Sequence, residues 1–311
     1  MKHMDPADTT SRIKARKRGN RAGILFFQIL ARVGGLSAAY GFLNFVCLYY
    51  LLVDRDAVRS TIPYVRRMFP SAGALRRRWL VYRLFVQQGK HLIDRYAQLG
   101  GHYPFQISMD GREKLQALAG ASHGMILLNS HVGNWQLVMG ALDHLGKNIH
   151  LVMRPEDNAA VREAFQLDQE GGRIRVISID APFGGVVDIM NALQAGDVVC
   201  LMGDRPYDFD PVHVSFLGAP ARFPYSSFMI AAMAEVPVVV LLSAKTAKNA
   251  YTIEVPAVYC PTKGARGRKQ EHWAGYVQQY ADELACFLQR YPLQYFVFQD
   301  LWGAQDDEKP D

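Results

Sequence analysis

The pattern of hydrophobic and polar positions divides the chain near Tyr103 and Pro104. Beyond that point, short apolar runs alternate with stretches of helical periodicity. Strand-like runs lie at residues 125–129, 149–153, 175–179, 197–202, 237–243 and 251–255, with a last one near 295–298. Helical patterns lie at 113–119, 135–145, 159–170, 184–195, 228–234 and about 271–290, and a long loop is expected from 203 to 226. The alternation predicts an α/β fold with a central, mostly parallel or mixed sheet flanked by helices.

The part of the chain before this domain is apolar and basic. No charged residue occurs from Val33 to Val53, which is about the length needed to cross a hydrocarbon core. Arginines clustered between positions 66 and 83 are interleaved with Trp79, Tyr82 and Phe85, a mixture that suits an anionic headgroup layer. This region therefore predicts a transmembrane span or re-entrant hairpin, helices lying in the interface, or a buried helix pair of a soluble protein. A cleaved signal peptide is not expected, because no short apolar core with a small-residue cleavage site follows the basic tract.

Four parts of the chain follow from these patterns. Residues 1–22 are expected to form a basic flexible tail, 23–100 a membrane-associated helical region, 101–303 the α/β domain and 304–311 a polar tail. The charge distribution supports the division, because the excess of Lys and Arg behind the net charge of +6 lies in the N-terminal region. Such a basic region indicates an anionic partner, and its long apolar runs favour a membrane surface over nucleic acid. The four cysteines form no CxxC pair, and three of them lie in apolar or helix-like contexts that favour buried thiols, which fits a reducing cytoplasm.

Some short motifs imitate known active sites. The sequence GASHG places Ser122 in a GxSxG pattern, but a helix-like segment precedes it and a strand follows, the reverse of a nucleophile elbow. Asp208 and Asp210 form a DxD pair of the kind that can share a divalent cation. The chain has no P-loop and no GxGxxG motif, and its histidines show no zinc spacing. Because a DxD pattern is only three letters long and is common in acidic loops, the sequence predicts neither a cofactor nor a bound metal.

Polar groups follow several of the predicted strands. His131 follows the strand at 125–129, Arg154 the strand at 149–153, and Asp204 with Arg205 the strand at 197–202. Because the carboxyl ends of parallel strands meet at one edge of a sheet, we expect these groups to converge on one site.

Five motifs in order resemble a known family. NSHVGNWQ, MRPEDN, GDRP, VSFLGAPARFP and AEVPVVVLL are similar to the lysophospholipid acyltransferase superfamily, and most closely to its bacterial branch of lipid A late acyltransferases. The resemblance covers roughly residues 12–302. It implies that His131, in the family's HxxxxD/E motif, is the general base, and that Arg205, with Asp204 beside it, contacts a phosphate or the acyl donor. Candidate substrate-binding residues are Asn134, Arg154, Arg205, Phe216, Gly218 and Phe223.

The chain departs from this motif at Gln136, where the family has an acid. A glutamine can accept a hydrogen bond from the imidazole, but it brings no negative charge to stabilise an imidazolium. Three outcomes follow: the amide serves in a neutral dyad, Asp204 or another acid replaces the carboxylate, or catalysis is lost and the protein only binds lipid. Asp143 is seven residues beyond Gln136 on the same predicted helix, about 10 Å along its axis, and is too distant to serve.

The resemblance predicts a membrane-associated O-acyltransferase at the cytoplasmic face of the inner membrane. It would move a fatty acyl group from an acyl carrier protein or CoA thioester to a hydroxyl of a lipid or glycolipid, with His131, Gln136 and Asp204 as catalytic candidates. The alternative is a catalytically impaired lipid- or carrier-binding protein on the same fold. A third hypothesis is a membrane-bound, metal-dependent glycosyltransferase that uses Asp208 and Asp210.

Overall fold

The structure is a computed structural model of the chain. It describes residues 21–99, 103–140, 142, 145–153, 173–181, 185–206, 211–264 and 269–303.

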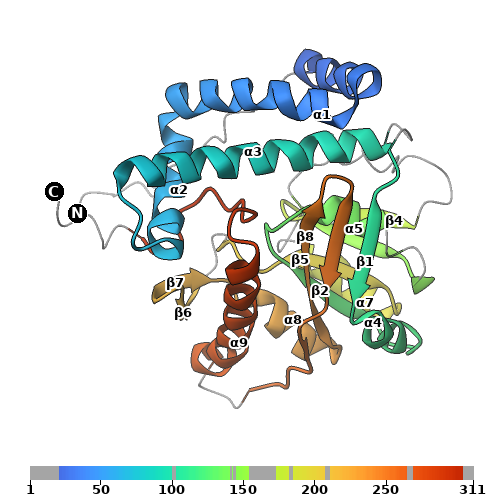
Figure 1. Cartoon of the computed structure of the whole chain (residues 1–311). Helices are drawn as coiled ribbons and strands as arrows, with labels where there is room; N and C mark the ends of the chain where they lie inside the picture. Colours follow the sequence, from blue (N-terminus) through green and yellow to red (C-terminus); the bar gives the residue numbers. More distant parts are fainter. Residues whose placement is uncertain are drawn as a thin grey trace, which may run out of the picture.

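A mixed sheet of eight strands forms the centre of the described part of the chain (Figure 1). Along the main path the strands are β1 (Gln106–Asp110), β9 (Ala250–Glu254), β8 (Val238–Ala247), β2 (Met125–Asn129), β5 (Val198–Met202), β3 (Ile149–Met153) and β4 (Ile174–Ser178), and β10 (Val258–Tyr259) also pairs with β8. The five strands from β8 to β4 are parallel, and β9 and β1 run the opposite way. Strand β2 lies between β8 and β5, so its end is near the middle of the parallel edge.

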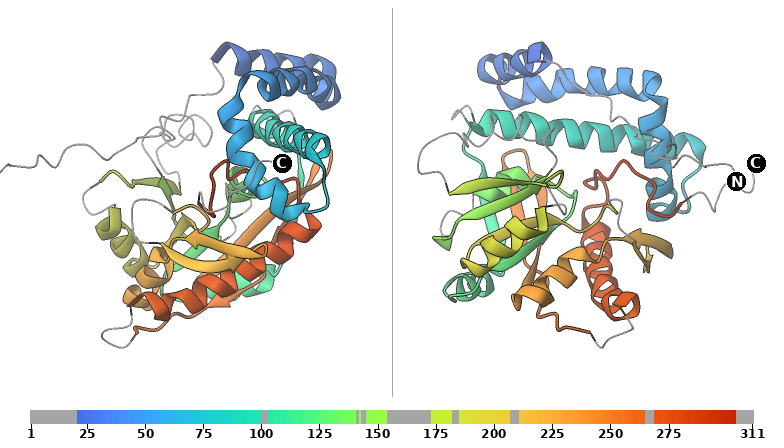
Figure 2. Two further views of the ribbon diagram at one scale, coloured as in Figure 1. Left: turned by 90° about the vertical axis from the view of Figure 1, so that its left-hand side faces the viewer. Right: turned by 180° about the vertical axis from the view of Figure 1, so that it is seen from behind.

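Helices cover both faces of this sheet. Helices α4 (Arg112–Ala119) and α5 (Trp135–Gly140) pack on one face, and α7 (Val186–Gln194), α8 (Ser226–Ala234) and α9 (Lys269–Arg290) pack on the other (Figure 2). Strand β2 contributes Ile126 and Leu128 to one core and Met125 and Leu127 to the other. Because both faces are covered, the strand is apolar at successive positions and does not alternate with polar residues.

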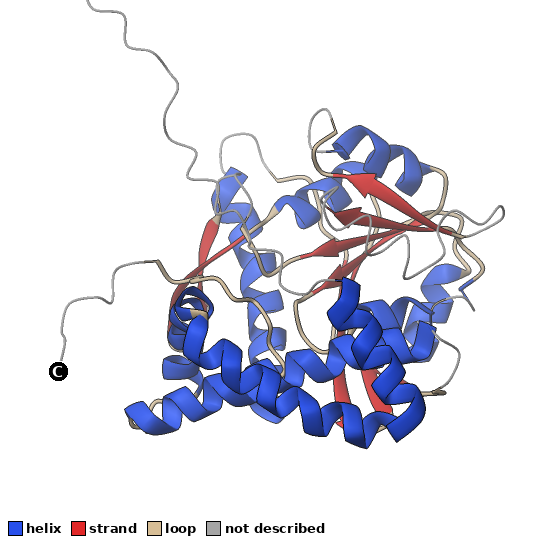
Figure 3. Ribbon diagram, turned by 90° about the horizontal axis from the view of Figure 1, so that it is seen from above, coloured by secondary structure: helices blue, strands red, loops and turns tan. Residues whose placement is uncertain are grey.

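The N-terminal helices form a separate layer above the sheet. Helices α1 (Arg21–Val53), α2 (Arg55–Met68) and α3 (Ala74–Leu99) lie across one side of the edge where the parallel strands end (Figures 1 and 3). Helix α1 breaks at Gly35, whose φ of 74° and ψ of 172° are readily adopted only by glycine. The break turns the apolar segment into two helical pieces, and Leu36, Ala39, Leu43 and Cys47 bury one face of the second piece.

Most of the predicted elements are present. The strands expected at 125–129 and 149–153 have the predicted bounds, and the mixed, mostly parallel sheet with an apolar N-terminal helix confirms the predicted fold class. The helix expected at 159–170 lies outside the described residues. The helix expected at 135–145 ends at Gly140, and Leu142 is in a turn.

Two expectations were wrong, and one strand of the main sheet path was missed. The loop expected at 203–226 contains a hairpin of β6 (Val212–Phe216) and β7 (Ala219–Phe223), joined by Leu217 and Gly218 with positive φ angles of 51° and 81°. Two such residues are typical of the tight turns that join hairpin strands. The strand expected at 295–298 is reduced to a bridge between Val132 and Tyr295, and β1 was not anticipated.

Candidate active site

His131 and Asp204 form a bidentate contact at the carboxyl edge of the sheet. The imidazole Nδ1 of His131 lies 2.7 Å from Asp204 Oδ1, and the backbone N–H of His131 donates to Asp204 Oδ2 at 2.7 Å. The carboxylate thus binds the same residue through its ring and through its backbone. With Nδ1–H directed at the carboxylate, Nε2 has a free lone pair and can accept a proton.

The pairing of β2 with β5 brings these two residues together. Asn129 and Met202 are register partners at the ends of the two strands, and His131 and Asp204 each follow two residues later. Gly203 connects β5 to Asp204 where space is limited: a Cβ there would lie 2.7 Å from Leu128 Cδ1 and 2.9 Å from Tyr280 Cζ. The glycine therefore allows the strand end to approach β2 and α9 closely.

Asp204 is a fully buried carboxylate, with none of its surface exposed. Burial opposes its ionisation, but the charge of His131, the two hydrogen bonds from that residue and the charge of Arg205 together lower its pKa. The carboxylate is therefore held ionised next to a half-buried imidazole. This arrangement supplies the negative charge that Gln136 does not provide.

The C-terminal segment fixes the loop that carries His131. The backbone N–H of Phe296 donates to His131 O at 2.7 Å, and Phe296 O accepts from Arg205 Nη2 at 2.9 Å. Gly133 N donates to Gln294 O at 3.0 Å. Gly133 has a φ of 57°, and a Cβ there would lie 2.0 Å from Ser243 O, so only glycine fits. One short segment thus binds both the histidine loop and the neighbouring arginine.

Comparison with known proteins agrees with this geometry. A profile of the bacterial lipid A biosynthesis acyltransferases matches residues 96–303, about two thirds of the chain. The chain belongs to this family. No curated protein sequence matches it. The matched region contains His131, Asp204 and the C-terminal segment, whereas α1 and α2 precede it.

Of the other residues predicted for the site of this acyltransferase, Arg205 lies beside the His131–Asp204 pair, whereas Gln136 and Asn134 form no hydrogen bond with it among the described residues. Gln136 is half-buried on α5, and among the described residues no hydrogen bond joins it to His131. Asn134 is buried, and its amide donates to His91 O at 2.9 Å on α3. Arg205 lies at the site, with one Nη2 donor used by Phe296 and an Nε that has no partner in the described part of the chain. Arg154 lies outside the described residues.

The predicted residues of the β6–β7 hairpin are mostly packed inside the acyltransferase. Phe216 is stacked on Trp302 with ring centroids 5.8 Å apart, and it also contacts the equally buried Phe223. Gly218 forms part of the hairpin turn. The burial of both rings favours a role in supporting the site, because Phe223 packs against Tyr280 and Phe216 against Tyr295.

The structure places one of the two motifs that imitate known active sites, the GxSxG pattern of Ser122, away from this site. Ser122 is exposed before the first residue of β2, at the opposite end of that strand from His131. Asp208 and Asp210 lie outside the described residues. Within the described ranges, no three His, Cys, Asp or Glu side chains are grouped as metal ligands.

Sequence reasoning did not identify three supporting residues of the acyltransferase site. Tyr280 on α9 shares a 2.6 Å hydrogen bond with Ser130 Oγ, and its hydroxyl also lies 3.1 Å from Asn129 O. Gln294 and Phe296 hold the histidine loop through backbone groups. No side-chain pattern reveals backbone contacts of this kind.

Proposed function

We propose that this family member is an active, membrane-associated O-acyltransferase in which His131 is the general base and Asp204 replaces the acid missing at position 136. The observation that carries the proposal is the 2.7 Å contact between His131 Nδ1 and the buried carboxylate of Asp204. An ionised carboxylate at this nitrogen selects the tautomer with a basic Nε2. It also stabilises the imidazolium that forms when Nε2 takes a proton.

The proposed reaction is direct transfer of an acyl group to an alcohol. His131 Nε2 takes the hydroxyl proton of the lipid acceptor as that oxygen attacks the carbonyl carbon of the acyl thioester. The tetrahedral intermediate collapses with cleavage of the carbon–sulfur bond, and the proton on His131 is transferred to the leaving thiolate. The products are an acyl ester and a free thiol, and no acyl-enzyme forms.

The family implies an acyl donor and a lipid A precursor as acceptor, and we propose a thioester of acyl carrier protein or CoA as the donor. Arg205 is half-buried beside Asp204 and has further guanidinium donors besides the one bound to Phe296. A phosphate of the donor or of the lipid headgroup is a suitable partner for these donors. The basic N-terminal region suits both an acidic carrier protein and an anionic membrane.

We also propose that α1 holds the enzyme at the cytoplasmic face of the inner membrane. The stretch Leu25–Val53 is long and apolar enough to cross a membrane. The break at Gly35 and the packing of the second piece along α3 instead favour two short helices lying in the interface. Trp79, half exposed with Arg83 4.8 Å above its ring, is the kind of side chain found at headgroup depth.

Three single variants test the proposed dyad. Acyl transfer from a defined acyl carrier protein thioester to a lipid A precursor would be measured for His131→Ala, Asp204→Asn and Gln136→Glu. We expect His131→Ala to abolish transfer and Asp204→Asn to lower kcat by about 10⁴, the loss seen when the acid of a Ser-His-Asp triad becomes an amide. Gln136→Glu should leave the rate within a few-fold of wild type. Strong activity in Asp204→Asn would overturn the role of Asp204.

Gln136 itself favours the alternative, a protein of this family that binds lipid or carrier without catalysis. That function predicts no turnover by the wild type on any thioester, and no gain in Gln136→Glu. The same assay distinguishes the two functions, because only an active enzyme has a rate that Asp204→Asn can reduce.

A further inference from the structure

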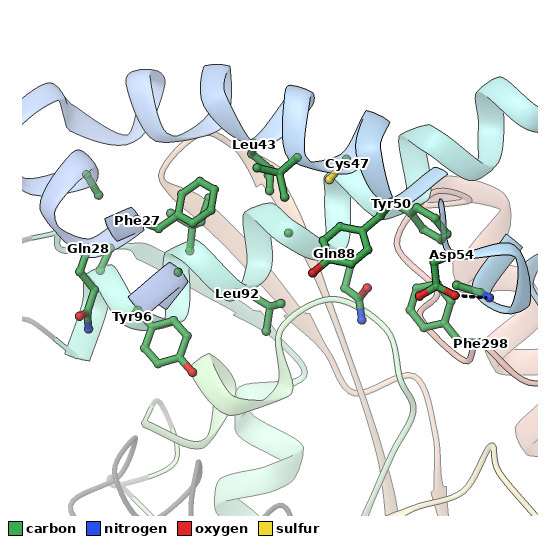
Figure 4. Close-up of a pocket in the computed structure, with 18 residues that line it drawn as sticks. Phe27, Gln28, Leu43, Cys47, Tyr50, Asp54, Gln88, Leu92, Tyr96 and Phe298 are labelled. Carbon is green, nitrogen blue, oxygen red and sulfur yellow. Dashed lines mark hydrogen bonds between the residues drawn. The ribbon is translucent and has the colours of Figure 1, made fainter. Parts of the chain in front are cut away.

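A long apolar groove lies between α1 and α3, apart from the His131–Asp204 pair (Figure 4). Its volume is about 540 Å³, within the usual range for small-molecule sites. Leu43 and Cys47 of α1 project towards Gln88 and Leu92 of α3, and Phe298 lies at one end of the groove (Figure 4). The lining is mostly aliphatic and aromatic, with polar groups such as Gln28, Gln88 and Asp54 among it.

The length of the groove matches that of a lipid chain. Its α3 wall runs from Phe85 to Ala97, which at 1.5 Å per residue is about 18 Å. One leaflet of a bilayer has a hydrocarbon depth of about 15 Å, half of the usual core thickness. The groove can therefore hold one extended hydrocarbon chain.

One end of the groove is lined by Phe298, which belongs to the same short segment as Phe296. Phe298 packs on Phe85 with ring centroids 5.9 Å apart, and its backbone has a φ of 39°, which is uncommon for a residue with a side chain. Phe296, two residues earlier, donates its backbone N–H to His131 O. Two residues span at most about 7.6 Å of backbone, so a chain that ends at Phe298 has its polar end near the His131 loop.

The opposite side of α1 indicates how a ligand reaches the groove. Most of the large apolar side chains that the described part of the chain exposes lie on α1: Leu25, Phe26, Ile29, Val33, Phe42, Phe45, Leu48, Tyr49, Leu52 and Val53. An apolar patch of this kind is typical of a membrane contact. On the membrane association proposed above, the helix that forms one wall of the groove is itself the lipid-contacting element.

We propose that this groove binds one hydrocarbon chain of the lipid acceptor and so sets which acceptors are used, an inference that rests on the proposed function. A membrane lipid reaches a groove walled by α1 by moving sideways within the bilayer. A thioester on a soluble carrier arrives from water, where the α/β domain is accessible. The groove holds the acceptor's chain, and its hydroxyl lies beyond Phe298, towards Nε2 of His131.

A variant that fills the groove tests the proposal. Leu92 lines the groove and is 48% exposed, so Leu92→Trp adds bulk to the groove without disturbing the core. With a long-chain acceptor, we expect KM to rise about tenfold, the effect of losing roughly two buried methylene groups, while kcat stays within about twofold. An acceptor that is shorter by several carbons should be affected little.

The matched control is Leu75→Trp, the same substitution on the same helix outside the groove, where the side chain is 86% exposed. It should leave KM unchanged for every acceptor. The chain-length preference for the thioester donor should be unchanged in both variants. If Leu92→Trp shifts the donor preference and leaves acceptor KM unaffected, the groove binds the donor chain and the proposal is overturned.

A binding experiment without turnover separates this proposal from the proposed function. A phosphatidylglycerol with a photoreactive diazirine on one acyl chain would be added in vesicles to wild type, His131→Ala and Leu92→Trp, and labelled peptides mapped by mass spectrometry. We expect labels on groove residues of α1 and α3 in the first two proteins and a several-fold loss in Leu92→Trp. Labels confined to the outer face of α1 would overturn the proposal. Groove labelling in a protein that transfers no acyl group would refute the proposed function alone.

Discussion

At the scale of single residues, we propose that Asp204 takes the place of the acid of the HxxxxD/E motif. The family's acid lies five positions after the histidine, which in this chain is a helical position occupied by Gln136. Asp204 comes from the neighbouring strand β5 and reaches Nδ1 of His131 from the side of the sheet. Because Asp204 also accepts the backbone N–H of His131, it fixes the ring and the loop together. A helix-borne acid that contacts only the ring would fix the ring alone.

The lowered pKa of Asp204 predicts how stability depends on pH. Its folded pKa lies below its unfolded value of about 3.9, so the ionised carboxylate stabilises the fold fully above that pH, and the contribution is lost as pH falls through the folded pKa. Wild type should therefore be more stable than Asp204→Asn at pH 5 to 7, with the difference shrinking below about pH 4. Thermal unfolding in detergent across this range measures both proteins.

A control for this comparison is Asp188→Asn, which removes an exposed carboxylate on α7. Its profile should follow that of wild type. A stability difference between wild type and Asp204→Asn that stayed constant from pH 3 to pH 7 would contradict an ionised, stabilising Asp204.

Sequence patterns indicated individual candidate residues more readily than the contacts between them. His131, Asp204 and Arg205 were chosen as candidates because polar groups that follow apolar strands can be recognised from the sequence alone. The contact between His131 and Asp204 spans 73 positions and depends on β5 lying next to β2, which strand patterns do not determine. Asn134 illustrates the limit: the motif suggested a substrate contact, whereas its amide is buried against His91 O.

At the scale of elements, a buried charge cluster joins the N-terminal helices to the sheet. Asp94 of α3 is fully buried, accepts from the hydroxyls of Tyr40 and Tyr251, and lies 2.5 Å from the ammonium of Lys245 on β8. Burial raises the pKa of Asp94, while Lys245 and the hydrogen bonds oppose that shift. The cluster ties α1, α3, β8 and β9 together on the side where α3 crosses the sheet.

Removing one partner of the Asp94–Lys245 ion pair should lower the free energy of unfolding more than removing both charges. Lys245→Met leaves the Asp94 carboxylate buried without its cation, and we expect it to lower the free energy of unfolding by about 3–5 kcal/mol. The double variant Asp94→Asn, Lys245→Met removes both charges and should recover part of that loss. Urea unfolding in detergent measures all three proteins.

Lys263→Met is the control for the charge-pair experiment, because it breaks an exposed pair with Glu235 and should change stability little. If the double variant proved no more stable than Lys245→Met, the uncompensated charge of Asp94 would not be the cause of the loss.

Elements whose sequence has one clear pattern of apolar and polar residues were predicted. Elements whose pattern is mixed with loop-forming residues, or whose backbone bonds elsewhere, were not. Strand β2 is buried on all five residues and reads as a continuous apolar run. Strand β6 alternates buried and exposed residues, but it follows a stretch rich in Pro and Asp and was read as part of a loop. The apolar run at 295–298 has strand composition, yet Phe296 uses its backbone groups on His131 and Arg205 in place of a sheet partner.

At the scale of the whole molecule, the apolar surface and the active site are on the same side. Helix α1 exposes large side chains on the side away from α3, and α3 crosses the sheet at the edge that carries His131 (Figure 1). A membrane in contact with α1 therefore lies on the active-site side of the sheet. We propose that this placement lets a lipid acceptor stay in the bilayer while its headgroup reaches the imidazole.

The outer face of α1 gives a direct test of this orientation. Phe45 and Leu52 are 73% and 62% exposed and take no part in the groove, so Phe45→Asp with Leu52→Asp alters the proposed membrane contact alone. Burial of each large apolar side chain contributes about 1.5–3 kcal/mol, so the double variant should bind vesicles of phosphatidylglycerol and phosphatidylethanolamine at least about 100-fold more weakly. Co-flotation with the vesicles measures the change.

The control variant, Val187→Asp with Met233→Asp, places the same charges at two exposed apolar positions of the α/β domain and should leave vesicle binding unaltered. Equal loss in both double variants would mean that α1 does not direct the protein to the bilayer, and the active-site edge would then have no reason to face it.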